Sequence, residues 1–177
     1  MKKLTVLFLL LTTSITAQTD PNIYKIIDAI SAKRIKNDIK ILTEFGTRNT
    51  FSDTISNTRG IGAARRWIKS EFETISKNCN SCIDVFYQKD FVTKKGNRRV
   101  PHDAWIVNVV AIQKGSKYPN RFIIMSGDID SRASNTMDFT TDAPGANDNA
   151  SGMAGTIEAA RVLSKYKFES SIIYVGL

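Results

Sequence analysis

Three short, nearly continuous apolar segments place the strongest limit on how this chain can fold. They are IVNVVAI at residues 106–112, FIIM at residues 122–125 and SIIYV at residues 171–175. Their length and composition are typical of strands, and a strand that is apolar on both faces belongs in a sheet that helices cover on both sides. The sequence therefore predicts an α/β fold with a mixed, largely parallel sheet flanked by helices.

Two amphipathic helices and a half-buried strand are expected beside these segments. Residues 29–46 repeat apolar side chains at helical spacing, with Ser31 as a candidate N-cap and Gly46 as the stop. Residues 61–76 place an apolar stripe on one face of a second helix. The alternating segment 83–92 is typical of a half-buried strand. A further helix leads back to the last apolar segment, as in a βαβ unit.

Residues 1–17 have the layout of a secretory signal peptide: two lysines, an apolar run, and small and polar residues up to Ala17. The run is far shorter than the ~20 residues of a membrane-spanning helix, and no later segment is long and apolar enough to span a bilayer. A buried or anchoring helix is the alternative. We expect cleavage near Ala17 and a secreted or periplasmic protein, with residues 18–177 belonging to one domain.

The formal charge of +8 does not indicate a nucleic-acid partner. The lysines and arginines are scattered, apart from short pairs. No aromatic residues are interleaved with them in the way that base stacking requires. A solvated basic surface is therefore the expectation.

The two cysteines, Cys79 and Cys82, are a disulfide candidate. Two cysteines cannot form a zinc ribbon, which needs four ligands. They follow a predicted helix and precede a strand, whereas a thioredoxin-type motif opens a helix after a strand. In an exported protein a local disulfide is expected, and free thiols are the alternative.

Carboxylates gather after the segment 122–125. The strand ends in Asp128 and Asp130, and Asp138, Asp142 and Asp148 follow in the loops. Ligands bind beyond the carboxyl ends of strands in such sheets, and the loop is long enough to return Asp148 to the strand end. Converging carboxylates repel one another unless a cation or protons compensate them.

These carboxylates predict a metal site, with an ordinary turn as the alternative. Oxygen ligands alone suit Mg, Ca or Mn, whereas zinc usually takes some His or Cys. In the alternative, the Asp and Asn residues only form turns, and Ser151 caps the following helix.

The same residues resemble peptidase family M28, the di-zinc aminopeptidases and their relatives. The resemblance rests on PGANDNASG at residues 144–152, on a following helix that contains Glu158, and on a preceding strand that ends in D-x-D-S-R. The family pattern is H-x-D-S, P-G-A-x-D-N-x-S-G, a helix with E-A-A/E-x-A-R, and a strand leading to G-E-E. LTEFGTRNT, GIGAARRWI and IVNVVA also look like family segments. The resemblance covers roughly residues 35–177 and implies a zinc-exopeptidase fold, also called phosphorylase/hydrolase-like.

The resemblance implies a role for each matching residue. Asp148 matches the carboxylate that bridges two zinc ions, and the family pattern implies a cis peptide bond from it to Asn149. Asp128 stands where the family has a His ligand, although an Asp can also bind zinc through oxygen. Asp130 matches the catalytic-site aspartate that orients that His without binding metal, so here it has no imidazole to hold. His102 matches no ligand position and is interpreted as a loop residue.

The family's general-base Glu and its later ligands follow the strand that residues 171–175 begin. Glu158, within a helix, and Glu169, before the strand, do not replace them. We therefore expect the N-terminal part of an M28 peptidase domain, incomplete at its C-terminus and inactive by itself. In the complete protein, a water on the two zinc ions would attack a peptide carbonyl. The alternatives are an altered or non-catalytic relative, such as a glutaminyl cyclase-like or binding domain, which Asp128 favours, and an unrelated secreted binding module.

Overall fold

A computed structural model describes residues 20–135 and 137–177, which divide into a unit up to Ile30 and a unit from Ser31 to Leu177. The predicted signal peptide lies outside the described residues. In the first unit, helix α2 (Pro21–Asp28) begins after Asp20, whose side chain accepts from the N–H of Asn22 at 2.9 Å. This helix was not predicted from the sequence, although an Asp followed by Pro is a helix-start signal.

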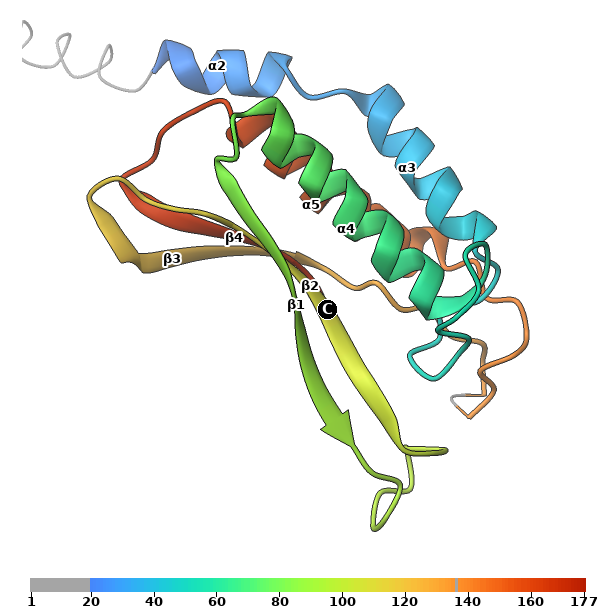
Figure 1. The fold of residues 1–177 in the computed structure, drawn as a ribbon. Coiled ribbons are helices and arrows are strands. Elements are labelled where there is room, and N and C mark those ends of the chain that lie inside the picture. Colours follow the sequence, from blue (N-terminus) through green and yellow to red (C-terminus); the bar gives the residue numbers. More distant parts are fainter. Residues whose placement is uncertain (1–19, 136) are drawn as a thin grey trace, which may run out of the picture. The chain divides into compact units, whose positions relative to one another are not determined.

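The second unit is a four-stranded sheet with helices (Figure 1). Its elements, in chain order, are α3 (Ala32–Glu44), α4 (Gly60–Asn78), β1 (Ile83–Val92), β2 (Ala104–Gln113), β3 (Tyr118–Gly127), the π-helical turn η1 (Ala146–Ala150), α5 (Ser151–Leu163) and β4 (Ser170–Gly176). The α/β class and the mixed sheet are confirmed. The segment β3–α5–β4 is the predicted βαβ unit, because β3 and β4 pair in parallel.

The expectation of a largely parallel sheet is corrected by the strand order β1-β2-β4-β3. Within the described residues, β1 pairs antiparallel with β2, and β2 pairs antiparallel with β4. The connection between β1 and β2 contains no helix, and a parallel pair would need a longer crossover connection. The two strands therefore form a hairpin.

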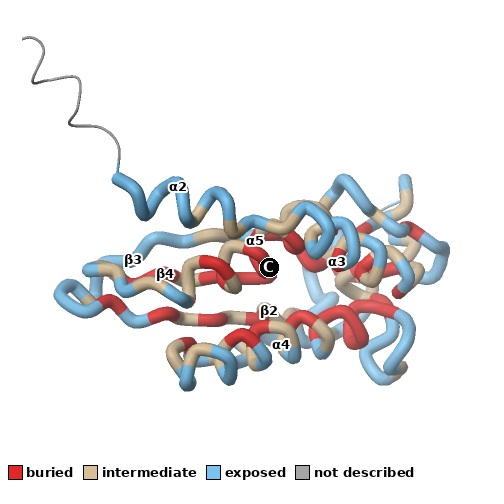
Figure 2. Tube along the Cα trace, turned by 90° about the horizontal axis from the view of Figure 1, so that it is seen from above, coloured by how far each residue is buried: buried red, intermediate tan, exposed pale blue. Residues whose placement is uncertain are grey.

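The described helices α4 and α5 lie on the same face of the sheet (Figure 1). Their side chains form the core with the facing side chains of the strands, and buried residues run along β2, β4 and α4 (Figure 2). The other face carries Phe86, Phe122 and Ile124, with exposed fractions of 43%, 54% and 65%. The expectation that helices cover both faces is therefore corrected for the described residues, although the strands are apolar on both sides.

Local signals account for both ends of α3. The Ser31 side chain caps the helix by accepting from the N–H of Arg34 at 3.3 Å. The helix ends at Glu44, and Gly46 follows with a φ of 73°, a conformation that glycine adopts without steric cost. The predicted cap and stop are both confirmed.

A disulfide bond between Cys79 and Cys82 closes the turn from α4 to β1. The two residues inside this turn, Asn80 and Ser81, have φ values of 56° and 61°. Few non-glycine residues adopt such values. The covalent link restricts the alternative conformations of this segment in the unfolded chain.

The buried carboxylate of Glu158 joins α5 to the start of α3. Glu158 accepts hydrogen bonds from Arg161 Nε and from the N–H of Ser31, both at 2.7 Å, and Arg34 Nε lies 3.6 Å away. Burial raises the pKa of Glu158, but these hydrogen bonds and charges outweigh it and hold the pKa below its ordinary value of 4.5. Glu158 is therefore committed to the fold.

We predict that Glu158→Gln lowers the free energy of unfolding at pH 7 by about 2 kcal/mol, because it weakens charge-assisted hydrogen bonds. A carboxyl group with a lowered folded-state pKa stabilises the fold above its unfolded-state pKa, and this contribution is lost as the pH falls through the folded-state pKa. Urea denaturation should therefore show a difference between the two proteins that is full at pH 7 and shrinks below pH ~4.

The matched control is Glu169→Gln. Glu169 forms a surface ion pair with Lys117 at 3.3 Å, and this pair is expected to contribute less than about 1 kcal/mol. A difference between Glu158→Gln and the unaltered protein that stays constant from pH 7 to pH 3 would contradict the prediction.

Candidate metal site

The end of β3 and the loop before α5 meet at one edge of the sheet. The N–H of Asp128 donates to Asn149 Oδ1 at 3.1 Å. Because Asn149 directly follows Asp148, this hydrogen bond brings Asp148 to the end of β3, as the loop length predicted. The end of β4 lies beside them, since the N–H of Leu177 donates to the carbonyl of Gly127 at 3.1 Å.

Two glycines allow the loop to close in this way. Gly145 has a φ of 49°, and a Cβ there would lie 2.5 Å from the carbonyl oxygen of Asp148. At Gly152, a Cβ would lie 2.1 Å from Asn149 Oδ1, the atom that accepts from Asp128. The peptide bond between Asp148 and Asn149 is cis, as the resemblance implied. The glycines of the motif are therefore required by close contacts at the strand end.

The alternative in which Ser151 caps the helix is wrong. Ser151 is the first residue of α5, and its hydroxyl donates to the carbonyl of Asn147 at 2.9 Å. The capping position belongs to Ala150, which has helical dihedrals and no side-chain cap. The chain enters α5 through η1, so the residue directly before the helix is helical rather than extended, and its alanine side chain cannot cap it.

Asp128 and Asp148 present carboxylates that no described residue engages. Both residues are exposed, and within residues 20–135 and 137–177 neither side chain accepts a hydrogen bond or forms an ion pair. Asp128 also lines a small cavity of about 240 Å³ beside the ends of β2 and β3. Two carboxylates at one strand end with unused oxygens can bind a cation.

Asp130 is already bound by the protein. It is half-buried, and its Oδ2 accepts from Thr50 Oγ1 at 2.9 Å. The buried guanidinium groups of Arg48 and Arg65 also attract it electrostatically. The family pattern would place an imidazole beside Asp130, but this chain has Asp128 at that position. The hydroxyl of Thr50 and the charges of the two arginines stabilise the Asp130 carboxylate instead.

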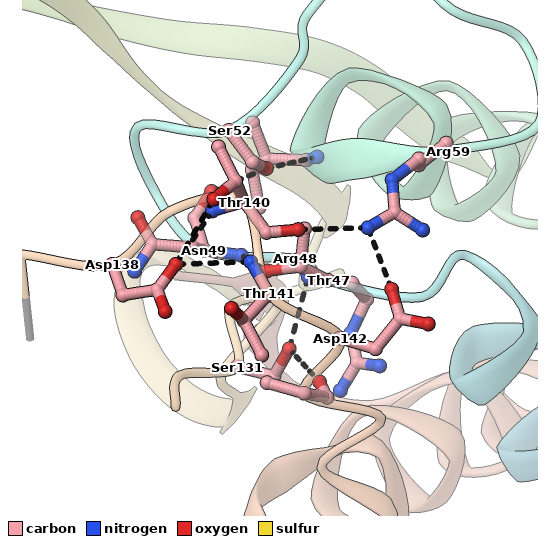
Figure 3. A network of polar contacts seen from close by, with 12 residues as sticks. Thr47, Arg48, Asn49, Ser52, Arg59, Ser131, Asp138, Thr140, Thr141 and Asp142 are labelled. Atoms are coloured by element: carbon pink, nitrogen blue, oxygen red, sulfur yellow. Dashed lines mark hydrogen bonds and ion pairs between the residues drawn. The ribbon is translucent and has the colours of Figure 1, made fainter. Parts of the chain in front are cut away.

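Asp138 and Asp142, which the sequence analysis grouped with these carboxylates, have structural partners (Figure 3). Asp138 Oδ1 accepts from the N–H groups of Thr141 at 2.9 Å and Thr140 at 3.0 Å, and these bonds hold the pKa of Asp138 well below its usual range. Asp142 pairs with Arg59 at 2.6 Å. The expected group of five aspartates is therefore reduced to three at the strand end.

Arg48 connects the segments that form this edge. It is fully buried, and Nε donates to the carbonyl of Ile129 at 2.8 Å. Nη1 donates to Leu42 at 2.8 Å and to Pro144 at 2.7 Å, and Nη2 donates to Gly145 at 3.1 Å. Burial lowers the pKa of Arg48 to about 10, so it remains a cation at neutral pH. The role of Arg48 was not predicted, because the sequence GTRNT is typical of an exposed polar loop.

Ser131 completes the connection between these segments (Figure 3). Its hydroxyl accepts from the N–H of Arg48 at 2.9 Å and donates to the carbonyl of Ala143 at 2.5 Å. The N–H of Ala143 donates to the carbonyl of Gly46 at 3.0 Å. The beginning and the end of the loop between β3 and η1 are thus both fixed to the segment that follows α3.

We predict that Arg48→Met lowers the free energy of unfolding by about 3 kcal/mol or more, because buried carbonyl groups lose their donors. Arg48→Lys should lose less, since it keeps the charge but has three donors for four carbonyls. Urea denaturation followed by circular dichroism measures both. The control is Arg132→Met, an exposed arginine at the same edge, and equal stability of Arg48→Met and this control would disprove the connecting role.

We also predict that Gly152→Ala and Gly155→Ala change the free energy of unfolding in opposite directions. The new Cβ at Gly152 would displace Asn149, whereas a Cβ at Gly155 meets nothing within 4 Å. Gly152→Ala should lower the free energy of unfolding by about 1–3 kcal/mol. Gly155→Ala, inside α5, should raise it by up to about 1 kcal/mol. Thermal unfolding of both variants tests this, and equal shifts would contradict it.

The described residues do not group a complete metal-ligand set. No three His, Cys, Asp or Glu side chains among them form a metal-binding group. His102 is exposed in a loop, as expected, and lies between the rings of Phe51 and Phe139 at centroid distances of 5.6 and 5.4 Å. Asp128 and Asp148 therefore fit a pair of oxygen ligands, whereas a zinc site takes at least three protein ligands.

Sequence comparisons identify related proteins over most of the chain. The family profile described as Peptidase family M28 matches residues 108–176. The chain is 42% identical over 154 residues to a protein of Pyrenophora teres f. teres named "Probable zinc metalloprotease", covering 87% of this chain and 32% of that protein. A protein of Leptosphaeria maculans with a similar name is 42% identical over 158 residues, covering 89% and 36%. The chain thus spans about a third of the length of these curated relatives.

Solved structures share the fold. A leucine aminopeptidase precursor from Bacteroides thetaiotaomicron aligns with a TM-score of 0.61 at 21% identity, covering 84% of this chain and 47% of that chain. A glutaminyl cyclase of Tannerella forsythia aligns with a TM-score of 0.61 at 17% identity, covering 83% and 46%. At these identities the likeness is one of fold alone.

Among residues 20–135 and 137–177, no helix is both long enough and apolar enough to cross a bilayer.

Proposed function

Because this chain belongs to peptidase family M28, we propose that it supplies Asp148 and Asp128 to the metal site of a zinc-dependent peptidase. The observation that carries the proposal is the hydrogen bond from the N–H of Asp128 to Asn149, which brings the two carboxylates to one strand end. Both are exposed and unengaged within the described part of the chain, whereas Asp138, Asp142 and Glu158 are committed to structural contacts.

We assign Asp148 and Asp128 as two of the residues that would hold zinc, each through carboxylate oxygens. Bound zinc would lower the pKa of a coordinated water and polarise a peptide carbonyl. The protein's own contribution is to hold the two carboxylates in place through Arg48, Asn149 and the loop glycines. Further ligands are needed, since two oxygen ligands do not complete a zinc site.

Asp130 acts in this proposal as a positioning residue. In the family pattern the equivalent aspartate orients a His ligand. Here Thr50 and the buried arginines hold Asp130 instead, so its carboxylate fixes the strand end beside Asp128. We further propose that the substrate is a peptide processed from its amino end, as in aminopeptidases, and that the protein is exported after cleavage near Ala17.

A second candidate function follows from Asp128. With a carboxylate in place of an imidazole, the site has a harder ligand set, which favours oxygen-binding cations over zinc. This would suit an altered or non-hydrolytic relative, such as a cyclase-like or binding domain. Metal preference separates the two candidates.

We predict that Asp148→Ala lowers zinc affinity by about tenfold or more, because even indirect supports of a zinc site change affinity by about 10–100-fold. Asp128→His should raise zinc affinity, since zinc prefers nitrogen to oxygen ligands. Isothermal titration with zinc, calcium and magnesium measures both effects. Asp90→Ala, on the β1–β2 hairpin, is the control and should leave affinity unchanged.

Two results would refute the first candidate. One is equal zinc affinity of Asp148→Ala and the unaltered protein. The other is tighter binding of calcium or magnesium than of zinc, which would favour the second candidate.

A further inference from the structure

Two neighbouring cavities, one of about 240 Å³ and a larger one of about 930 Å³, lie between the Asp128 edge and the β1–β2 hairpin, and they share Thr50, Arg65 and Val107 as lining residues. The larger cavity lies between α4, the loop that precedes it, and the two hairpin strands. We call it the Arg65 groove. Its size is in the range of small-ligand sites.

Arg65 on α4 is buried without a full set of partners. It is 7% exposed, and its Nε has no hydrogen-bond partner among the described residues. Arg48, the other buried arginine at this edge, donates to four carbonyl groups. A buried charge is costly unless it is paired and hydrogen-bonded, and Arg65 is a buried cation of the groove for which no ion pair is seen among the described residues.

The acidic groups near Arg65 are engaged elsewhere. Asp130 attracts Arg65 electrostatically, but its Oδ2 accepts from Thr50. Asp53 accepts from the N–H groups of Ile55 and Ser56, and Asp103 accepts from the N–H of Lys94. Arg65 is therefore a hydrogen-bond donor in the groove that an anion could engage.

The neighbouring arginines of the groove are not available in the same way. Arg66 donates to the carbonyl groups of Thr54 and Ile55 at 2.9 and 3.2 Å. Arg59 is paired with Asp142. These two side chains hold the loop that forms the groove wall, and Arg65 alone of the three points its buried guanidinium group at the cavities without such acceptors.

Aromatic rings form the other walls of the groove. His102 lies between Phe51 and Phe139, and Tyr87 and Trp105 line the hairpin side. Trp105 is 56% exposed although it is large and apolar. Such a wall offers a surface to a flat apolar group, next to the donor cation.

We propose that the Arg65 groove binds the carboxylate of a peptide whose carboxyl-terminal residue is aromatic. The carboxylate receives a forked pair of hydrogen bonds from Arg65, and the aromatic side chain lies against Trp105 and Phe51. The proposal rests on the proposed function for the placement of the peptide, because Asp128 lines the neighbouring small cavity, which shares Arg65 with the groove. It assigns a substrate class: short peptides with a free aromatic carboxyl-terminal residue.

The test compares two probes that differ only in charge, N-acetyl-L-phenylalanine and its amide. Both lack a free amine, and the titrations contain a chelator, so zinc binding does not enter. Binding is followed by calorimetry and by the fluorescence of Trp105, with Trp105→Phe to assign the signal. We expect the acid to bind about tenfold or more tightly than the amide, because a charge-assisted pair is stronger than a neutral one.

Arg65→Met should abolish this preference, and Arg121→Met, an exposed arginine on β3, should keep it. Equal binding of acid and amide by the unaltered protein overturns the proposal, as does the absence of binding by both. A preference that persists in folded Arg65→Met also overturns it. If this variant does not fold, the comparison of acid with amide still decides.

Failure of this proposal is distinguishable from failure of the proposed function. Asp148→Ala should lose zinc affinity but keep the preference for the acid. If zinc affinity is unaffected by Asp148→Ala while the preference is present, the groove stands and the metal assignment falls. If Asp148→Ala loses zinc affinity but the unaltered protein shows no preference for the acid, the groove proposal is refuted and the metal assignment is kept.

Discussion

The buried guanidinium group of Arg48 is the interaction on which the candidate site depends. Its four hydrogen bonds reach carbonyl groups at the end of α3, after β3 and in the loop before α5. Carbonyl dipoles, assisted by the more distant charge of Asp130, balance the cation, so all three segments must be in place together for the charge to be tolerated inside the protein. The position of Asp148 relative to Asp128 follows from this requirement.

The acidic groups of the protein separate into two kinds by their partners. Asp138 binds turn N–H groups, Asp142 binds Arg59, and Glu158 binds Arg161 and the start of α3. Each of these carboxylates stabilises the structure. Asp128 and Asp148 have no such partners among the described residues and face solvent at the strand end. A metal site is the physical use that this difference supports, since exposed paired carboxylates contribute little to folding by themselves.

Asp128, which stands where the resemblance leads one to expect a His, lies close to a carboxylate with particular surroundings, that of Asp130. Thr50 donates to this carboxylate, and Arg65 lies near it with its Nε unsatisfied. The same arginine faces the aromatic groove. Arg65 thus lies between the candidate metal site and the Arg65 groove. The two proposals share this residue, but each is tested by a separate measurement.

The sequence by itself determined the elements and the motif. Apolar periodicity predicted β1 to β4 and α3 to α5, the Ser31 cap and Gly46 stop followed from local chemistry, and PGANDNASG indicated the family. These signals depend on residues that are close together in the chain, so they can be recognised from the sequence alone. The missed helix α2 had a local signal that we did not use.

Only the tertiary structure decided the sheet order, the uncovered sheet face and the roles of the two arginines. The sequences around Arg48, in GTRNT, and Arg65, in GAARRW, do not distinguish these buried arginines from exposed ones. The burial of Arg48 depends on segments about 80 residues away, such as Ile129. Five aspartates also looked equivalent in sequence, but Asp138 accepts from the neighbouring N–H groups of Thr140 and Thr141, and Asp142 pairs with the distant Arg59. For Arg48 and Asp142, long-range contacts that no local pattern encodes determine that the charge is structural.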